Sequence, residues 1–195
     1  GSSLTPRQKQ YQKITRKRDV AILSVFLGTG IRISECVGLD KKDVDLNLCA
    51  INVTRKGGTK AVLYFSDEVA KAVTEYLDWL DKQKLNETPL IRLPCNDKNS
   101  AFSSLQGNRI TVRAVQLLVE KYCSIVSPLK HITPHKLRST FGTTLYRETQ
   151  DIYVVADVLG HKDINTTKKH YAAISDEIRR NAANVIKLRD TDDDK

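Results

Sequence analysis

Two side chains that can handle a phosphate group, His135 and Arg138, lie three residues apart at the start of a predicted helix. Thr133 and Pro134 begin this helix, because Thr supplies a capping oxygen and Pro is tolerated at the first helical position. The spacing places His135 and Arg138 on one helical face, near a helix end that favours anions. Arg can donate two parallel hydrogen bonds to a phosphate, and His can move a proton near neutral pH. The pair could therefore act on a phosphate, although a solvated helical face with an incidental His has the same pattern.

The elements that would position this pair are mostly helical. Gly28 to Gly30 end the first apolar helix, Ser34 can cap a short second helix, and Gly160 ends the last one. Residues 86–108 lack periodicity and are predicted to be a connector. Periodicity predicts helices over residues 19–27, 66–80, 111–122, 133–145 and 151–159, and strands over 49–54 and 61–65 around a hairpin turn at 55–60. We therefore predict a mainly α fold with a small antiparallel β-sheet, an α+β class.

The charge balance favours a polyanionic partner. The 195 residues hold 32 Lys and Arg against 23 Asp and Glu, a net charge of +9. Residues 190–195 hold four Asp and one Lys, so the rest of the chain carries +12. A basic balance raises the expectation of nucleic-acid binding without distinguishing DNA from RNA.

The cysteines and the apolar segments indicate the cellular compartment. Cys36, Cys49, Cys95 and Cys123 are scattered singly, which disfavours a zinc site and favours small core residues in a reducing compartment. The longest apolar run, residues 20–27, is too short to span a bilayer, and no signal peptide precedes it. We therefore expect a cytoplasmic protein. Residues 1–3, Gly-Ser-Ser, look like the remnant of an expression tag, so we expect the chain to be cut from a longer protein.

Three segments together carry a family resemblance. They are GTGIRISECVGL (28–39), TPHKLRSTFGTTLY (133–146) and LGHKDINTTKKHY (159–171). They resemble the conserved blocks of tyrosine recombinases, the phage integrase family, in the family's order, and a lysine-bearing hairpin lies between them. The resemblance extends from about residue 18 to residue 174 and is shared with mobile-element integrases and Xer-type recombinases. It implies the catalytic-domain fold of that family over residues 4–189, followed by an acidic tail over 190–195.

The resemblance also implies an activity and the residues that perform it. Members cleave and rejoin DNA strands through a 3′-phosphotyrosine, without metal, ATP or another cofactor. Arg32 and Arg138 would grip the scissile phosphate, and Tyr171 would be the nucleophile. His135 would accept a proton or a hydrogen bond, and His161 would help to hold the phosphate.

Lys56 and Glu35 also match positions of the family, but each has an alternative interpretation. Lys56 matches the hairpin lysine that protonates the leaving 5′ oxygen, but Arg55 and Lys60 could fill that role or contact the DNA backbone. Lys136 is a further candidate for a DNA contact. Glu35 matches a carboxylate that supports the site, and it could equally be an ordinary acid at a helix start.

The end of the chain leaves three points open. The interval from His161 to Tyr171 is one residue longer than the family's commonest spacing, and Tyr146 and Tyr153 are rivals that favour a core or surface role. Residues 175–188 form an amphipathic pattern, which either packs on its own domain or docks on a neighbouring protomer of a tetramer on DNA. An upstream DNA-binding domain, usual in the family, is expected to be missing from this chain.

These patterns predict a site-specific DNA recombinase acting on double-stranded DNA in a bacterial cytoplasm, with a mobile-element integrase as the favoured kind. A type IB topoisomerase shares the chemistry, and a DNA-binding relative without catalysis would share the fold. Complete retention of the expected catalytic set favours the recombinase over the inactive relative.

Overall fold

The computed structural model describes residues 6–55, 57–85, 99–104, 108–161, 163–165 and 167–168. The chain divides into two compact units, residues 1–141 and 142–195, and each is described by itself. The helices are α1 (Pro6–Thr29), α2 (Ile33–Gly38), a 3-10 turn η1 (Lys41–Asp43), α3 (Asp67–Leu85), α4 (Val112–Val126), α5 (Pro134–Thr149) and α6 (Ile152–Leu159), and the strands are β1 (Val44–Asp45), β2 (Ala50–Thr54) and β3 (Lys60–Tyr64). This confirms the prediction of a mainly helical chain with a small antiparallel sheet. The proposed limits at residues 4, 189 and 190 lie outside the described residues and stay a prediction.

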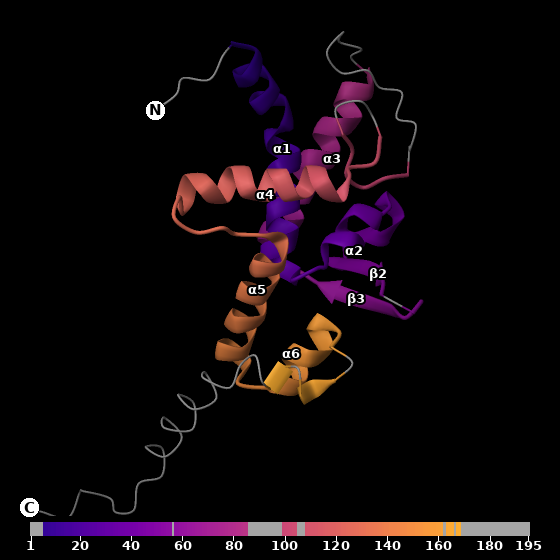
Figure 1. The fold of residues 1–195 in the computed structure, drawn as a ribbon. Helices are drawn as coiled ribbons and strands as arrows, with labels where there is room; N and C mark the ends of the chain where they lie inside the picture. Colours follow the sequence, from indigo (N-terminus) through magenta and orange to yellow (C-terminus); the bar gives the residue numbers. More distant parts are fainter. Residues whose placement is uncertain are drawn as a thin grey trace, which may run out of the picture. The chain divides into compact units, whose positions relative to one another are not determined.

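The core of the first unit forms where α1 packs beside α3 and α4 crosses α1 (Figure 1). Periodicity predicts that Val69, Val73, Leu77 and Leu80 form the apolar face of α3. Of these, Val69, Val73 and Leu80 are buried, whereas Leu77 is half-buried and Tyr76 is buried as well. Tyr76 can be buried because its phenol oxygen accepts a hydrogen bond from the Ser103 backbone N–H at 3.1 Å. The apolar face of α3 is therefore rotated slightly from the one that periodicity indicates.

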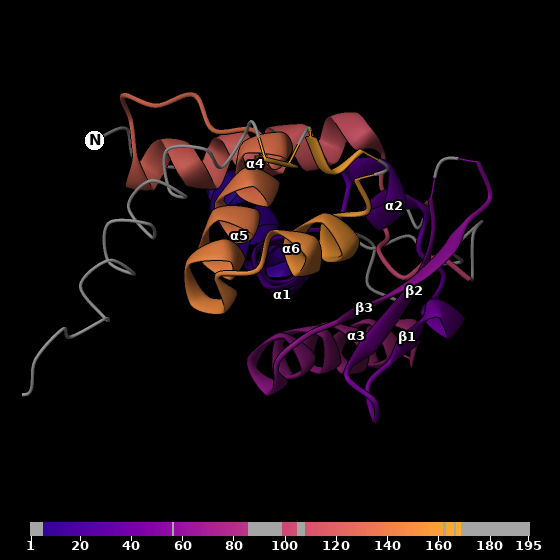
Figure 2. The same ribbon diagram turned by 90° about the horizontal axis from the view of Figure 1, so that it is seen from below.

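The sheet is antiparallel with strand order β1-β2-β3, and its strands lie side by side in Figure 2. Ile51 pairs with Leu63 and Thr54 pairs with Lys60, which closes the predicted hairpin. Ile51 and Leu63 are buried against the core, whereas Tyr64 on the other face is exposed. The alternation predicted two of the three strands. The two-residue β1 was missed because it is too short to show alternation.

Helix α1 begins earlier than predicted, at Pro6 instead of residue 19, and includes Gly28 and Thr29. Its first residues are mostly polar, so no apolar periodicity marks them. Within the described residues, none of the helices is both long enough and apolar enough to cross a membrane.

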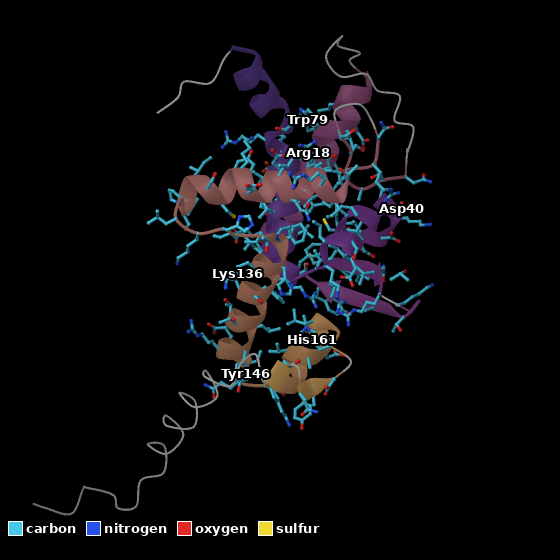
Figure 3. All side chains as sticks on the ribbon, viewed as in Figure 1. Arg18, Asp40, Trp79, Lys136, Tyr146 and His161 are labelled. Carbon is cyan, nitrogen blue, oxygen red and sulfur yellow. The ribbon has the colours of Figure 1, made fainter. Side chains whose placement is uncertain are left out.

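A polar cluster joins α1 to α4 at the place that Arg18 marks in Figure 3. Asp19 is buried and accepts hydrogen bonds from Arg18 at 2.7 and 3.0 Å and from the Tyr122 hydroxyl at 3.1 Å. Burial, followed by the charge and hydrogen bond of Asp19, raises the pKa of Tyr122 to about 12. Arg18 also donates to the Ser103 carbonyl at 3.3 Å. The cluster therefore fixes the crossing of α1 and α4 and the segment at residue 103.

Candidate active site

A tight turn after α1 positions Arg32. Gly30 has φ 61°, a left-handed conformation that Gly adopts without a Cβ penalty, and its N–H bonds to the Phe26 carbonyl at 3.1 Å. The Thr29 hydroxyl donates to the Val25 carbonyl at 2.7 Å and accepts from the Ile31 N–H at 3.2 Å. Because Ile31 is completely buried, Arg32 is held between an anchored residue and the start of α2.

Glu35 holds Arg32 by its backbone and by its side chain. One carboxylate oxygen accepts from the Arg32 N–H and the other from Arg32 Nη1, both at 2.9 Å. The Glu35 side chain is 5% exposed and that of Arg32 is 35% exposed, so the carboxylate is hidden while the guanidinium reaches solvent. Both interpretations of Glu35 fit this geometry, since it caps a helix start and orients an arginine. Its contribution to catalysis stays a prediction.

Arg138 is connected to the same turn from a position far along the chain. It is buried on α5, and its Nη1 donates to the carbonyl of Gly30. This contact joins residues 108 positions apart, and Gly30 lies only two residues before Arg32. The structure therefore brings Arg32, Glu35 and Arg138 into one cluster around the turn.

The beginning of α5 matches its prediction. Helix α5 starts at Pro134, and the Thr133 hydroxyl accepts from the Lys136 N–H at 3.3 Å. Leu137 packs into the core, while His135 is exposed. Lys136 is also exposed (Figure 3). His135 thus shares a helical turn with Arg138 but lies at the surface, where a substrate can reach it.

The hairpin turn is closed by backbone bonds. The Arg55 N–H donates to the Thr59 carbonyl at 2.8 Å, and the Gly58 N–H donates to the Arg55 carbonyl at 3.0 Å. Arg55 is half-buried, and Lys60 is exposed at the start of β3. Lys56 lies outside the described residues, so its role stays a prediction.

In the second unit, the end of α6 positions His161 (Figure 3). Gly160 has φ 60°, and its N–H bonds to the Asp157 carbonyl at 2.8 Å. The His161 N–H bonds to the Ala156 carbonyl at 2.9 Å, which completes a Schellman helix end. This confirms the predicted end of the helix at Gly160. The His161 side chain is half-buried, and its Nδ1 lies 2.7 Å from the Thr167 hydroxyl.

Thr167 contacts His161, and the sequence did not predict this contact. Threonine favours helix starts, so the sequence predicts that Thr166 and Thr167 start or cap a helix. Thr166 lies outside the described residues. Thr167 is completely buried and contacts His161 across six residues. No local pattern marks such a contact, because it depends on how the chain folds back after α6.

The tyrosines divide by exposure. Tyr146 on α5 is buried and Tyr153 on α6 is 66% exposed, which fits the core and surface roles considered for them. Tyr171 and the amphipathic segment at residues 175–188 lie outside the described residues. The assignment of Tyr171 as the nucleophile stays a prediction.

Cysteine, histidine and acidic side chains are the groups that could bind a metal. Among the described residues, no three His, Cys, Asp or Glu side chains gather in a way that could hold a metal ion. Cys36 is buried, and burial raises the pKa of its thiol to about 12. Cys36 is therefore a packing residue, as predicted, and metal-independent chemistry stays a prediction.

The sequence is similar to known proteins. The model of the phage integrase family matches residues 7–177. Tyrosine recombinase XerC of Thermodesulfovibrio yellowstonii is 36% identical over 162 residues, which is 80% of this chain and 50% of that protein. The chain thus spans about half the length of this curated relative.

Solved structures share the fold. A crystal structure of XerA recombinase superposes with a TM-score of 0.70 at 26% identity, covering 93% of this chain and 65% of that one. XerH site-specific recombinase, solved in a post-cleavage complex with a palindromic difH substrate, gives a TM-score of 0.70 at 21% identity, covering 93% of this chain and 48% of that one. The family model matches most of the chain, which shows that the chain belongs to the phage integrase family of tyrosine recombinases.

Proposed function

We propose that this chain is the catalytic part of a site-specific DNA recombinase that cleaves and rejoins strands through a 3′-phosphotyrosine. The observation that carries the proposal is the cluster of Arg32, Glu35 and Arg138 around the turn at Gly30. Two arginines from distant parts of the chain are held there before any substrate arrives. Such preorganisation is what stabilisation of a phosphoryl transition state requires.

The arginines act on charge that develops during the reaction. Displacement at a phosphodiester increases negative charge on the non-bridging oxygens, so fixed cationic donors stabilise the transition state more than the ground state. Arg32 and Arg138 supply these donors. His161, which the end of α6 holds, supplies a further hydrogen bond to the phosphate.

Proton transfers complete the proposed reaction. The phenol of Tyr171 attacks the phosphorus, the bond to the 5′ oxygen breaks, and Lys56 gives that oxygen a proton. His135, exposed one turn from Arg138, accepts the phenolic proton or a hydrogen bond. The phosphotyrosine conserves the energy of the broken bond, so the reverse attack by a 5′ hydroxyl rejoins DNA without ATP or another cofactor.

Double-stranded DNA is the proposed partner. The net charge of +9 attracts phosphates, and the exposed Lys60 and Lys136, with the half-buried Arg55, are candidates for backbone contacts. A mobile-element integrase in the cytoplasm of a bacterium is the favoured kind of recombinase. We further propose that the segment at residues 175–188 docks on a neighbouring protomer in a tetramer assembled on DNA.

A nicked suicide substrate tests the proposal, because loss of the short 5′ fragment traps the covalent intermediate. The chain should form an adduct that resists denaturation, and Tyr171→Phe should form none while binding DNA as before. Tyr153→Phe, which changes an exposed tyrosine on α6, is the matched control and should form a normal amount of adduct. Absence of adduct with the unaltered chain would favour a DNA-binding relative without catalysis. Relaxation of supercoiled DNA without strand exchange between sites would favour the topoisomerase.

A further inference from the structure

The contact between Thr167 and His161 places a buried hydroxyl on a ring that the proposed function uses. Thr167 is completely buried, and its Oγ1 lies 2.7 Å from His161 Nδ1. Within the described part of the chain, His161 is the partner that the structure gives this hydroxyl. The Schellman turn fixes the His161 backbone at the same time. The ring is therefore held at two points, its own backbone and Nδ1.

The chemistry of the two groups decides where the ring proton lies. A hydroxyl carries one O–H that must donate, whereas neutral imidazole has one nitrogen that donates and one that accepts. A buried donor without an acceptor is costly, and an oxygen that accepts no bond is tolerated more easily. The arrangement that satisfies Thr167 has its O–H donating to Nδ1. Nδ1 is then the bare nitrogen, and the proton of the neutral ring resides on Nε2.

We propose that Thr167 is a positioning residue for the reaction, because its hydroxyl fixes the His161 proton on Nε2 and turns that N–H toward the scissile phosphate. The inference rests on the proposed function, in which His161 holds the phosphate. A neutral Nε2–H donates to a non-bridging oxygen without first having to gain a proton. Thr167 thus acts through His161 and does not itself touch the DNA.

Nitrogen NMR on the free chain tests the proton placement independently of catalysis. The ¹⁵N shifts and ring-proton couplings of a neutral histidine identify the protonated nitrogen, and His161→Gln assigns the signal among the four histidines. The expected result is a bare Nδ1 and a protonated Nε2. A proton on Nδ1 overturns the proposal, because Thr167 would then be the acceptor. The NMR measurement needs no DNA, so it tests the position of the ring proton even if the chain does not cleave DNA.

Trapped cleavage tests the consequence. Thr167→Val removes the hydroxyl at nearly constant volume and should slow adduct formation roughly tenfold or more, the scale seen when partners that orient metal-bound histidines are lost. DNA affinity should change little. Thr167→Ser keeps a hydroxyl and should recover most of the rate. Thr144→Val, at an exposed position on α5, is the matched control and should cleave normally.

The double variant separates positioning from packing. In a His161→Gln background, Thr167→Val should cause no further loss of cleavage, because the residue it serves is gone. An equal loss in both backgrounds overturns the proposal and makes Thr167 a packing residue. A Thr167→Ser chain as slow as Thr167→Val also overturns it, since the hydroxyl would then not be the active feature.

Discussion

Glu35→Gln should separate the two jobs of this carboxylate, capping α2 and holding Arg32. The substitution keeps one carbonyl oxygen, so it can retain either the bond to the Arg32 N–H or the bond to Nη1, but not both. Losing a charge-assisted hydrogen bond in this buried setting should cost about 1.5–3 kcal/mol of folding stability. Urea denaturation measures that cost as a shift of the midpoint at constant slope.

Glu35→Gln should lower the cleavage rate by more than its loss of folding stability alone would cause. Without the carboxylate, the Arg32 guanidinium loses a fixed direction, and we expect adduct formation to slow roughly 10- to 100-fold with little change in DNA binding. The reason is that a loosened cation must be reordered each time the transition state forms. Single-turnover cleavage of the nicked substrate measures the rate of adduct formation, and a parallel titration measures the affinity for DNA.

The chain contains a matched control for this experiment. Asp43 caps the η1 turn in the same way, because its Oδ2 accepts from the Asp40 N–H at 2.9 Å. Asp43→Asn keeps a carbonyl oxygen that can still accept this single bond, so it should change folding stability little and leave cleavage unchanged. Equal loss of cleavage in Asp43→Asn and Glu35→Gln, or full cleavage by Glu35→Gln, would refute the assigned role of Glu35.

Three further outcomes follow from the same structure. Arg138→Ala should slow cleavage by on the order of 10²-fold with a much smaller loss of DNA binding; equal losses in both assays would make Arg138 a backbone-contacting residue. Cleavage should persist in EDTA, since the proposed site uses cationic side chains; loss in EDTA and rescue by Mg²⁺ would contradict this mechanism. Because the pKa of Tyr122 is raised to about 12, above its usual value of about 10, its contribution to stability should be complete below pH 10 and be lost as pH rises toward 12. Tyr122→Phe should lack that part of the alkaline decline, and an identical decline in both proteins would argue against it.

Local signals account for the parts of the fold that the sequence predicted well. Thr133 and Pro134 mark the start of α5, and Gly160 marks the end of α6, because each acts on hydrogen bonds within one helical turn. The alternation of apolar and polar residues on both sides of the glycines also predicted the hairpin. By contrast, the polar start of α1 carries no apolar period, so its beginning at Pro6 could not be read.

The site itself depends on contacts that no local pattern encodes. The bond between Arg138 and the Gly30 carbonyl joins residues 108 positions apart, and the resemblance to a family could group the arginines but could not reveal how they are held. Glu35 was left with two interpretations because its spacing from Arg32 suits both a cap and an ion pair. Thr167 was assigned to a helix start, whereas its burial against His161 comes from tertiary folding.

The central claim is that Tyr171 forms a covalent bond to DNA in a site built around the two arginines. Digestion of the trapped adduct with a protease, followed by mass spectrometry, identifies the residue that carries the 3′-phosphate of the oligonucleotide. The account predicts that the modified peptide contains Tyr171 and that the peptides with Tyr146 and Tyr153 are unmodified. An oligonucleotide on either of those two tyrosines, or on a serine, would contradict it.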